Sequence, residues 1–270
     1  HNPKHYFLCD IRELTNQDLP EELYNLDILD GSPPCTSFSM AGKREKGWGE
    51  EKKFREGQAV QTLDDLYFKF LDVAEELKPK VIVSENVSGL VKGGAKVYWK
   101  NILKRFDEIG YTAQTFLLNS ATMGVPQKRQ RVFIIGHKKE YNLPKLKLDF
   151  DEKPIPFGRF RTPEGNEPSD HYRKILLYRT KKDRCCADIV KRINGKLSGF
   201  TQSIVKDEAV FPTIIASADD FRYADGKACT DEDYITAGSF PQDYDFLGQK
   251  VGYVIGMSVP PVMVQKVAEQ

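Results

Sequence analysis

The sequence predicts an α/β protein whose sheet is largely parallel and covered by helices on both faces, with a smaller, less regular domain inserted. Short apolar runs alternate with segments of helical periodicity from Tyr6 to Gly136, and this alternation is typical of strand–helix–strand units. From Lys147 to Ile235, charged and irregular stretches such as Asp151–Pro154 break every period. The chain closes with the apolar segment Val259–Val264, whose two prolines suit the first turn of a helix that packs back onto the first domain.

Five apolar runs are the expected strands, and polar side chains follow three of them. The runs are Tyr6–Cys9, Leu26–Leu29, Val81–Ser84, Thr115–Asn119 and Arg131–Gly136. Asp10 and Glu85 come directly after the first and third runs, and Cys35 ends the turn that follows the second. Because ligands of open α/β sheets bind beyond the carboxyl ends of the strands, we expect these three side chains to meet in one crevice.

Two helices are expected between the strands. The first follows a Thr62–Asp65 pattern that resembles a capping box, and the second ends at Gly110. Their apolar residues recur at helical spacing, and they are Leu63, Leu66, Phe70, Val73, Ala74 and Leu77 in the first helix and Ile102, Leu103, Phe106 and Ile109 in the second.

The composition is that of an ordinary soluble globular protein, with 40% hydrophobic and 29% charged residues and a net charge of +1. This near-neutral net charge does not indicate a nucleic-acid-binding protein, although an enzyme can concentrate its Lys and Arg residues in one cleft. The five cysteines are scattered and form no CxxC pair, so we predict neither a metal site nor a disulfide framework, and we expect a reducing compartment. No apolar run approaches the roughly 18 residues of a membrane span, and no signal peptide is recognisable.

Each candidate side chain also has a plain structural interpretation. Cys35 follows Pro33–Pro34, a stiff turn that would aim its thiol outward, but free cysteines are also among the most buried residues. For Glu85 the alternative is a surface turn. Arg129 and Arg131 are two apart and would face the same side of an extended chain, whereas basic runs of this kind are usually solvated loops. The order and spacing of these residues, rather than any one of them, indicates a site.

The order of these segments resembles the motif series of the cytosine-C5 DNA methyltransferases of bacteria and phages. The matching segments are Asp10–Arg12, Gly31–Ser39, Glu85–Val87, Gly124–Phe133, Phe211–Ala216, Ser239–Tyr244 and Gly256–Pro261. The resemblance implies a Rossmann-like S-adenosylmethionine-dependent methyltransferase sheet formed by residues 1–146 and 236–270. It also implies a smaller inserted target-recognition domain at residues 147–235.

The reaction of this family accounts for the residue types in the motifs. The resemblance implies transfer of a methyl group from S-adenosyl-L-methionine to C5 of a cytosine flipped out of specific sites in duplex DNA. Because cytosine C5 is a poor nucleophile, the Cys35 thiolate would first add to C6. Glu85 would hydrogen-bond the Watson–Crick edge and assist protonation at N3. Arg131, together with Arg129, would hold the O2 side of the base.

The resemblance further implies a cofactor pocket and a closing loop. The residues that would line the pocket for S-adenosyl-L-methionine are Asp10, Ile11, Pro34, Leu66 and Ser258. Of these, Asp10 and Ile11 would contact adenine. The segment Gly42–Gln58 matches a loop that closes over the flipped base, with an ordinary solvated loop as the alternative.

The chain departs from the family pattern at two places. The Gly-rich turn after the family's first strand and the acidic residue that ends its second strand are not found, so we expect the chain to start after the second strand and to lack part of the cofactor pocket. Met257 stands where the family usually has Asn. A tRNA cytosine-C5 methyltransferase and a cofactor-deficient nucleic-acid-binding relative therefore remain as alternatives.

The expected partner is double-stranded DNA, with no membrane involved. We expect a monomer that acts in the cytoplasm of a bacterial cell or a phage-infected host. The sequence leaves open which DNA site is recognised and whether a cognate restriction endonuclease accompanies the protein.

Overall fold

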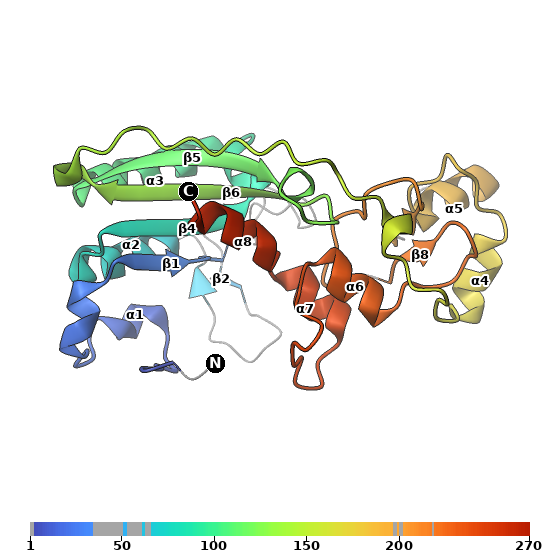
Figure 1. Ribbon diagram of the computed structural model, residues 1–270, viewed down its shortest axis with the longest axis horizontal. Coiled ribbons are helices and arrows are strands. Elements are labelled where there is room, and N and C mark those ends of the chain that lie inside the picture. The colour runs from blue at the N-terminus through green and yellow to red at the C-terminus, as the bar shows by residue number, and fades with distance from the viewer. Residues whose placement is uncertain are drawn as a thin grey trace. The chain divides into compact units, whose positions relative to one another are not determined.

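A computed structural model describes residues 3–34, 51–52, 61–62, 66–196, 199, 202–217 and 219–270 (Figure 1). The chain divides into two compact units, which we describe separately. The first unit comprises His1–Leu118 and Gln130–Leu146, and the second comprises Asn119–Arg129 and Lys147–Gln270. One break between the units therefore falls between Leu146 and Lys147, and the C-terminal residues 236–270 belong to the second unit. The division into a catalytic and a target-recognition domain stays a prediction.

The first unit is built on a four-stranded sheet. Its strands lie in the order β1 (Ile28–Gly31), β4 (Val81–Val87), β6 (Gln130–Lys138) and β5 (Tyr111–Asn119). Strand β1 runs parallel to β4, whereas β4 runs antiparallel to β6. Of these two pairings only β1–β4 has the expected parallel direction. Strands β5 and β6 are neighbours in the sheet and follow each other in the chain. Their connection is too short for the crossover of a dozen or more residues that parallel neighbours need, so the chain reverses its direction at β6.

The helices of this unit are α1 (Ile11–Leu14), α2 (Leu66–Leu77) and α3 (Ala95–Glu108), with short 3-10 turns at Glu21–Asn25, Ser88–Val91 and Lys139–Tyr141. The buried faces of α2 and α3 share one hydrophobic core with Ile82, Val132 and Ile134 of the sheet. These sheet residues alternate onto one face. Within this unit α2 and α3 therefore cover the same face, rather than one face each. A two-stranded antiparallel pair, β2 (Glu51–Lys52) and β3 (Gln61–Thr62), precedes α2.

The expected strand Tyr6–Cys9 is wrong, since no strand forms among the described residues before β1. Phe7 packs against a small core between α2 and the first turns of the chain, but Tyr6 is 75% and Leu8 88% exposed. A short apolar run does not suffice for a strand without a neighbouring strand to pair with. The segment instead leads into α1, whose first turn is capped by Asp10.

The second unit has the short, irregular elements that its sequence predicts. They are 3-10 turns at Ser120–Thr122 and Phe157–Arg159, the helices α4 (Asp170–Leu176), α5 (Cys186–Asn194), α6 (Asp231–Ala237), α7 (Val251–Met257) and α8 (Pro261–Ala268), and the strands β7 (Ile204–Val205) and β8 (Phe221–Arg222). Two hydrophobic cores support them. One gathers Phe157, Phe211 and Tyr234, and the other gathers Leu176, Ile189 and Phe221. As expected from the two prolines, α8 begins with Pro261.

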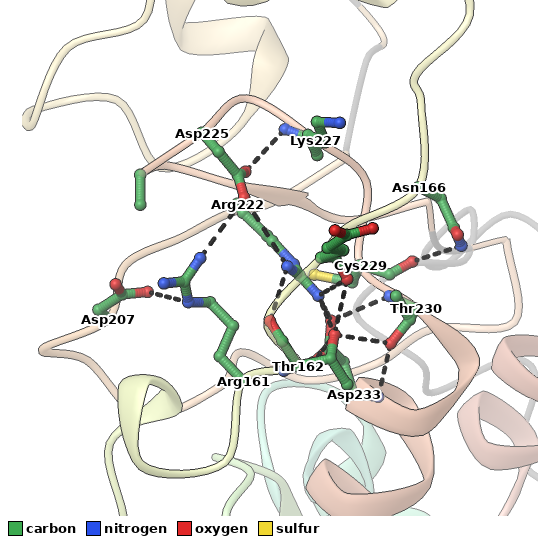
Figure 2. A network of polar contacts seen from close by, with 12 residues as sticks. Arg161, Thr162, Asn166, Asp207, Arg222, Asp225, Lys227, Cys229, Thr230 and Asp233 are labelled. Carbon is green, nitrogen blue, oxygen red and sulfur yellow. Dashed lines mark hydrogen bonds and ion pairs between the residues drawn. The ribbon is translucent and has the colours of Figure 1, made fainter.

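A buried polar network ties the start of α6 to the segment around Thr162 (Figure 2). Arg222 and Asp233 are both fully buried and form an ion pair of 2.6 Å. The Asp233 carboxylate also accepts hydrogen bonds from the backbone N–H groups of Thr162 and Thr230, each at 2.9 Å. Arg222 donates to the carbonyl oxygens of Thr162 and Glu164 at 3.0 and 3.1 Å. The network therefore satisfies most of the polar groups that it buries.

The stretch Val251–Ala268 is long and apolar enough to qualify as a membrane span by composition. In the structure it consists of two helices, α7 and α8, separated by Ser258–Pro260. Length and composition alone are weak evidence for a span, and this one is interrupted.

Candidate active site

The carboxyl ends of β1 and β4 lie side by side, because these two strands are parallel and Gly31 is in register with Ser84. A side chain at Gly31 would collide with the ring of Phe70, which explains why glycine ends β1. Beyond it, the carbonyl oxygen of Pro33 accepts a hydrogen bond from Asn86 Nδ2 at 3.2 Å. This hydrogen bond therefore holds the turn that precedes Cys35 next to Asn86, the neighbour of Glu85 in β4.

Cys35 itself lies outside the described residues, as does nearly all of the expected closing loop Gly42–Gln58. The described residues before it are the buried Pro33 and the exposed Pro34. These prolines fix the backbone dihedral φ at two successive positions. The chain thus leaves the sheet edge with little conformational freedom.

Glu85 and Arg131 form the charged pair of this edge. Glu85 Oε1 lies 2.9 Å from Arg131 Nε, and the two side chains are only 11% and 14% exposed. They come from neighbouring antiparallel strands, in which Glu85 is opposite Phe133 and Arg131 is opposite Val87, so they meet diagonally on one face of the sheet. Ser84 and Asn86 point to the other face. The guanidinium balances the carboxylate and fixes its direction.

Arg129 has different partners from Arg131. Its guanidinium is buried and donates to the carbonyl oxygens of Ile214 and Gly256, both at 2.8 Å. All three residues belong to the second unit. These contacts of Arg129 therefore join two segments of that unit.

The cofactor candidates of the first unit lie at its N-terminal helix and at the start of α2. The Asp10 carboxylate accepts a hydrogen bond from Arg12 N at 2.9 Å, keeps 26% of its side chain exposed and lies 3.5 Å from Arg12 Nη1. Ile11 is half-buried against the core, and Leu66 is buried. An acceptor carboxylate therefore remains accessible next to an apolar side chain.

The cofactor candidate of the second unit is Ser258, which ends α7. Its hydroxyl donates to the carbonyl oxygen of Val254 at 2.7 Å. The preceding Met257 is 64% exposed. A side chain at Gly256 would lie 2.5 Å from the backbone of Ile215 and Ala216, so only glycine permits this close approach.

A family model described as C-5 cytosine-specific DNA methylase matches residues 2–195. The chain belongs to this family. The expected recognition as a cytosine-C5 DNA methyltransferase is thereby confirmed, and so is the expected class of enzyme.

Relatives of this DNA methylase are bacterial and phage methyltransferases. The type II methyltransferase M1.HphI of Haemophilus parahaemolyticus is 27% identical over 99% of this chain and 74% of its own length. The type II methyltransferase M.NgoPII of Neisseria gonorrhoeae is 33% identical over 53% of this chain, which corresponds to 38% of its own length. The chain thus spans about three quarters of the first relative, and its match covers less than half of the second.

Solved structures of the same fold include a DNA modification methyltransferase encoded within a prophage (E. coli), with a TM-score of 0.62 at 18% identity over 95% of this chain and 80% of that one. The DNMT2 of Spodoptera frugiperda has a TM-score of 0.58 at 14% identity over 90% of this chain and 78% of its own. At such low identity the likeness shows the fold alone. It confirms the Rossmann-like methyltransferase fold class of this DNA methylase.

Three polar residues of the site were not assigned a role from the sequence. Asn86 fastens Pro33, as described above. Gln127 is fully buried and binds the backbone of Ile214 and Ala237, at 3.2 and 3.4 Å. The Ser120 hydroxyl donates to the carbonyl oxygen of Gln127 at 2.5 Å and accepts from Arg129 N at 2.9 Å. Asn86 and Gln127 stand inside recognised motifs, but their partners are distant in sequence.

Proposed function

We propose that this DNA methylase transfers a methyl group to C5 of a cytosine flipped out of specific sites in duplex DNA. The observation that carries the proposal is the buried Glu85–Arg131 ion pair, at the sheet edge where β1 leads through Pro33–Pro34 to Cys35. A carboxylate and a guanidinium there can bind the polar edge of a base. The family supports cytosine as that base.

In this proposal Cys35 is the nucleophile. Its thiolate forms a bond to C6, which makes C5 an enamine carbon, and Glu85 binds the Watson–Crick edge and assists protonation at N3. Arg131 holds the O2 side and the direction of the Glu85 carboxylate. After C5 has gained its methyl group, loss of the C5 proton and expulsion of the Cys35 thiolate restore the aromatic ring. Because a stacked base does not expose C6, the target leaves the duplex first.

The proposed cofactor is S-adenosyl-L-methionine, which when bound supplies the methyl group. The accessible Asp10 carboxylate and the apolar Ile11 beside it suit an adenine ring, which offers an amino donor and two flat faces. Pro34, Leu66 and Ser258 stay as further predicted contacts. For Arg129 we now propose a positioning role, because its guanidinium donates to two backbone carbonyls.

The proposed target recognition lies with residues 147–235, and the proposed place of action is the cytoplasm, where bacterial or phage DNA is accessible. A monomer, and a restriction endonuclease in the same system, remain open proposals. The rival substrate is tRNA, because the motif series resembles that of tRNA cytosine-C5 methyltransferases as well.

The test is covalent trapping on a duplex that carries 5-fluorocytosine, together with single-turnover methylation of ordinary duplex DNA. Fluorine at C5 cannot leave as a cation as the C5 proton does, so the adduct with Cys35 persists. Cys35→Ser should abolish both signals, whereas Cys185→Ser, which changes a partly exposed cysteine, should keep them. Methylation by Cys35→Ser would refute the nucleophile, and trapping on the matching RNA but not on DNA would refute the substrate.

A further inference from the structure

The turn between α4 and α5, Leu177–Arg184, carries an unusual excess of positive charge; we call it the α4–α5 tip. From His171 to Lys196 there are nine basic and two acidic side chains, whereas the whole chain has 40 basic and 39 acidic ones. The remaining residues therefore number 31 basic and 37 acidic. A basic surface on a chain that is otherwise acidic marks a binding site for a polyanion.

The lysines of this region are available for a ligand. The exposed lysines are Lys174, Lys181, Lys182, Lys191 and Lys196. None of the five forms an ion pair with a residue in the described ranges. Three of the arginines, by contrast, form ion pairs: Arg173 with Asp170, Arg184 with Asp188 and Arg192 with Asp183.

The α4–α5 tip is held in a defined shape by partly buried hydrogen bonds. The Asp183 carboxylate accepts from Thr180 N at 2.6 Å and from Arg192 Nη2 at 2.9 Å. Burial alone would raise the pKa of Asp183, but the hydrogen bonds from Arg192 and Thr180 lower it overall. Arg192 also donates to the carbonyl oxygen of Tyr178 at 2.6 Å, and Arg179 donates to that of Tyr223 at 2.7 Å. Because these hydrogen bonds already order the tip, binding costs it little conformational entropy.

The same turn exposes two large apolar side chains. Leu177 is 74% and Tyr178 is 59% exposed, although the hydrophobic core of α4 and α5 lies next to them in Leu176 and Cys186. Two neighbouring exposed apolar side chains form a small apolar surface that a ligand can cover. An exposed aromatic and an exposed apolar side chain beside unpaired lysines suit duplex DNA, because apolar side chains can contact base edges while the ammonium groups bind phosphates.

We propose that the α4–α5 tip is a contact surface for duplex DNA, with Lys181 and Lys182 on the phosphates and Tyr178 and Leu177 against base edges. The inference rests on the proposed function, since a DNA substrate supplies the polyanion. An anionic membrane surface, which would accept the same charges, is the alternative that the competition experiment tests.

The test measures DNA affinity of the full chain over a series of salt concentrations, for the parent and for the double variant Lys181→Ala/Lys182→Ala. Losing two phosphate contacts should reduce the slope of log K against log salt by about 1.8. The matched control is Lys96→Ala/Lys100→Ala on α3, which removes the same charge from two exposed lysines that also form no ion pair among the described residues. The control should keep the parental slope. Tyr178→Ala should weaken binding several-fold without changing the slope.

Equal slopes for the tip variant and the control would overturn the inference, and so would stronger competition by RNA of the same length or by anionic vesicles than by duplex DNA. Thermal unfolding of each variant checks that the tip remains folded. Failure of the proposed function has a different signature, namely no methylation and no trapping by the parent. In that case the two slopes still decide whether the tip binds DNA.

Discussion

Replacing Asp233 by Ala should destabilise the second unit more than any exposed charge change. Asp233 and Arg222 are both fully buried, and the carboxylate also receives the N–H groups of Thr162 and Thr230 (Figure 2). Removing Asp233 would leave the buried Arg222 with only its longer ion pair to the partly exposed Asp225, at 3.7 Å. Breaking a buried ion pair costs about 3–5 kcal/mol. The two orphaned N–H groups would each add to this cost, but not independently, so we expect a loss at the upper end of that range.

The assay must separate the two units, because both tryptophans of the chain, Trp48 and Trp99, belong to the first. Hydrogen exchange of peptides from each unit gives this separation. Exchange of core amides around Thr162 should accelerate by about three orders of magnitude, since each 1.4 kcal/mol is roughly a factor of ten. Peptides of the first unit should change much less.

The control is Asp219→Ala, which breaks the exposed ion pair with Lys250 in the same unit. Exposed pairs contribute only about 0–1 kcal/mol, so exchange should barely change. If Asp233→Ala accelerates exchange no more than Asp219→Ala does, the buried network does not stabilise this unit and our reasoning is wrong.

Two further predictions concern the site and the pH dependence. Glu85→Gln should lower the single-turnover rate of methylation by roughly two to four orders of magnitude. It should change DNA affinity far less, because phosphate contacts dominate affinity. Weaker DNA binding at an unchanged methylation rate would contradict the proposed role of Glu85. Burial raises the pKa of Asp220 from 3.8 to about 6, so the folded state binds this proton more tightly than the unfolded state does. The free energy of unfolding should therefore fall by about 3 kcal/mol as the pH rises between these two values. Asp220→Asn should remove this decline in urea unfolding between pH 4 and pH 7, and parallel curves for parent and variant would disprove the assignment.

Local sequence patterns were sufficient to predict those helices and strands whose formation depends on residues close together in the chain. The periodicity up to Leu77 and the stop at Gly110 predicted α2 and α3, and the apolar run from Val81 predicted β4. The strand continues to Val87, so Glu85 lies within it rather than directly after it. These features depend on residues within one or two turns of each other. The site edge was predictable for the same reason, because β1 and β4 are parallel and polar residues lie near the carboxyl end of β4.

Long-range partners could not be predicted in this way. The direction of β6 depends on the short connection from β5, which the alternating pattern does not reveal. The partners of Arg129 lie 85 and 127 residues further along the chain. The strand expected at Tyr6–Cys9 failed because its pattern says nothing of whether a neighbouring strand exists.

The segment Gly124–Arg131 shows why one motif can carry two kinds of residue. Gln127 and Arg129 bind backbone groups of Ile214, Ala237 and Gly256 in the second unit, whereas Arg131 pairs with Glu85 in the first. The boundary between the units falls directly after Arg129. Alternate positions of one extended segment therefore serve packing and the site. Since the guanidinium of Arg129 donates to two carbonyls in a fork, a lysine there would keep the charge but lose that geometry. The identity of a motif arginine thus has a structural cause at Arg129, and only at Arg131 do the contacts point to chemistry.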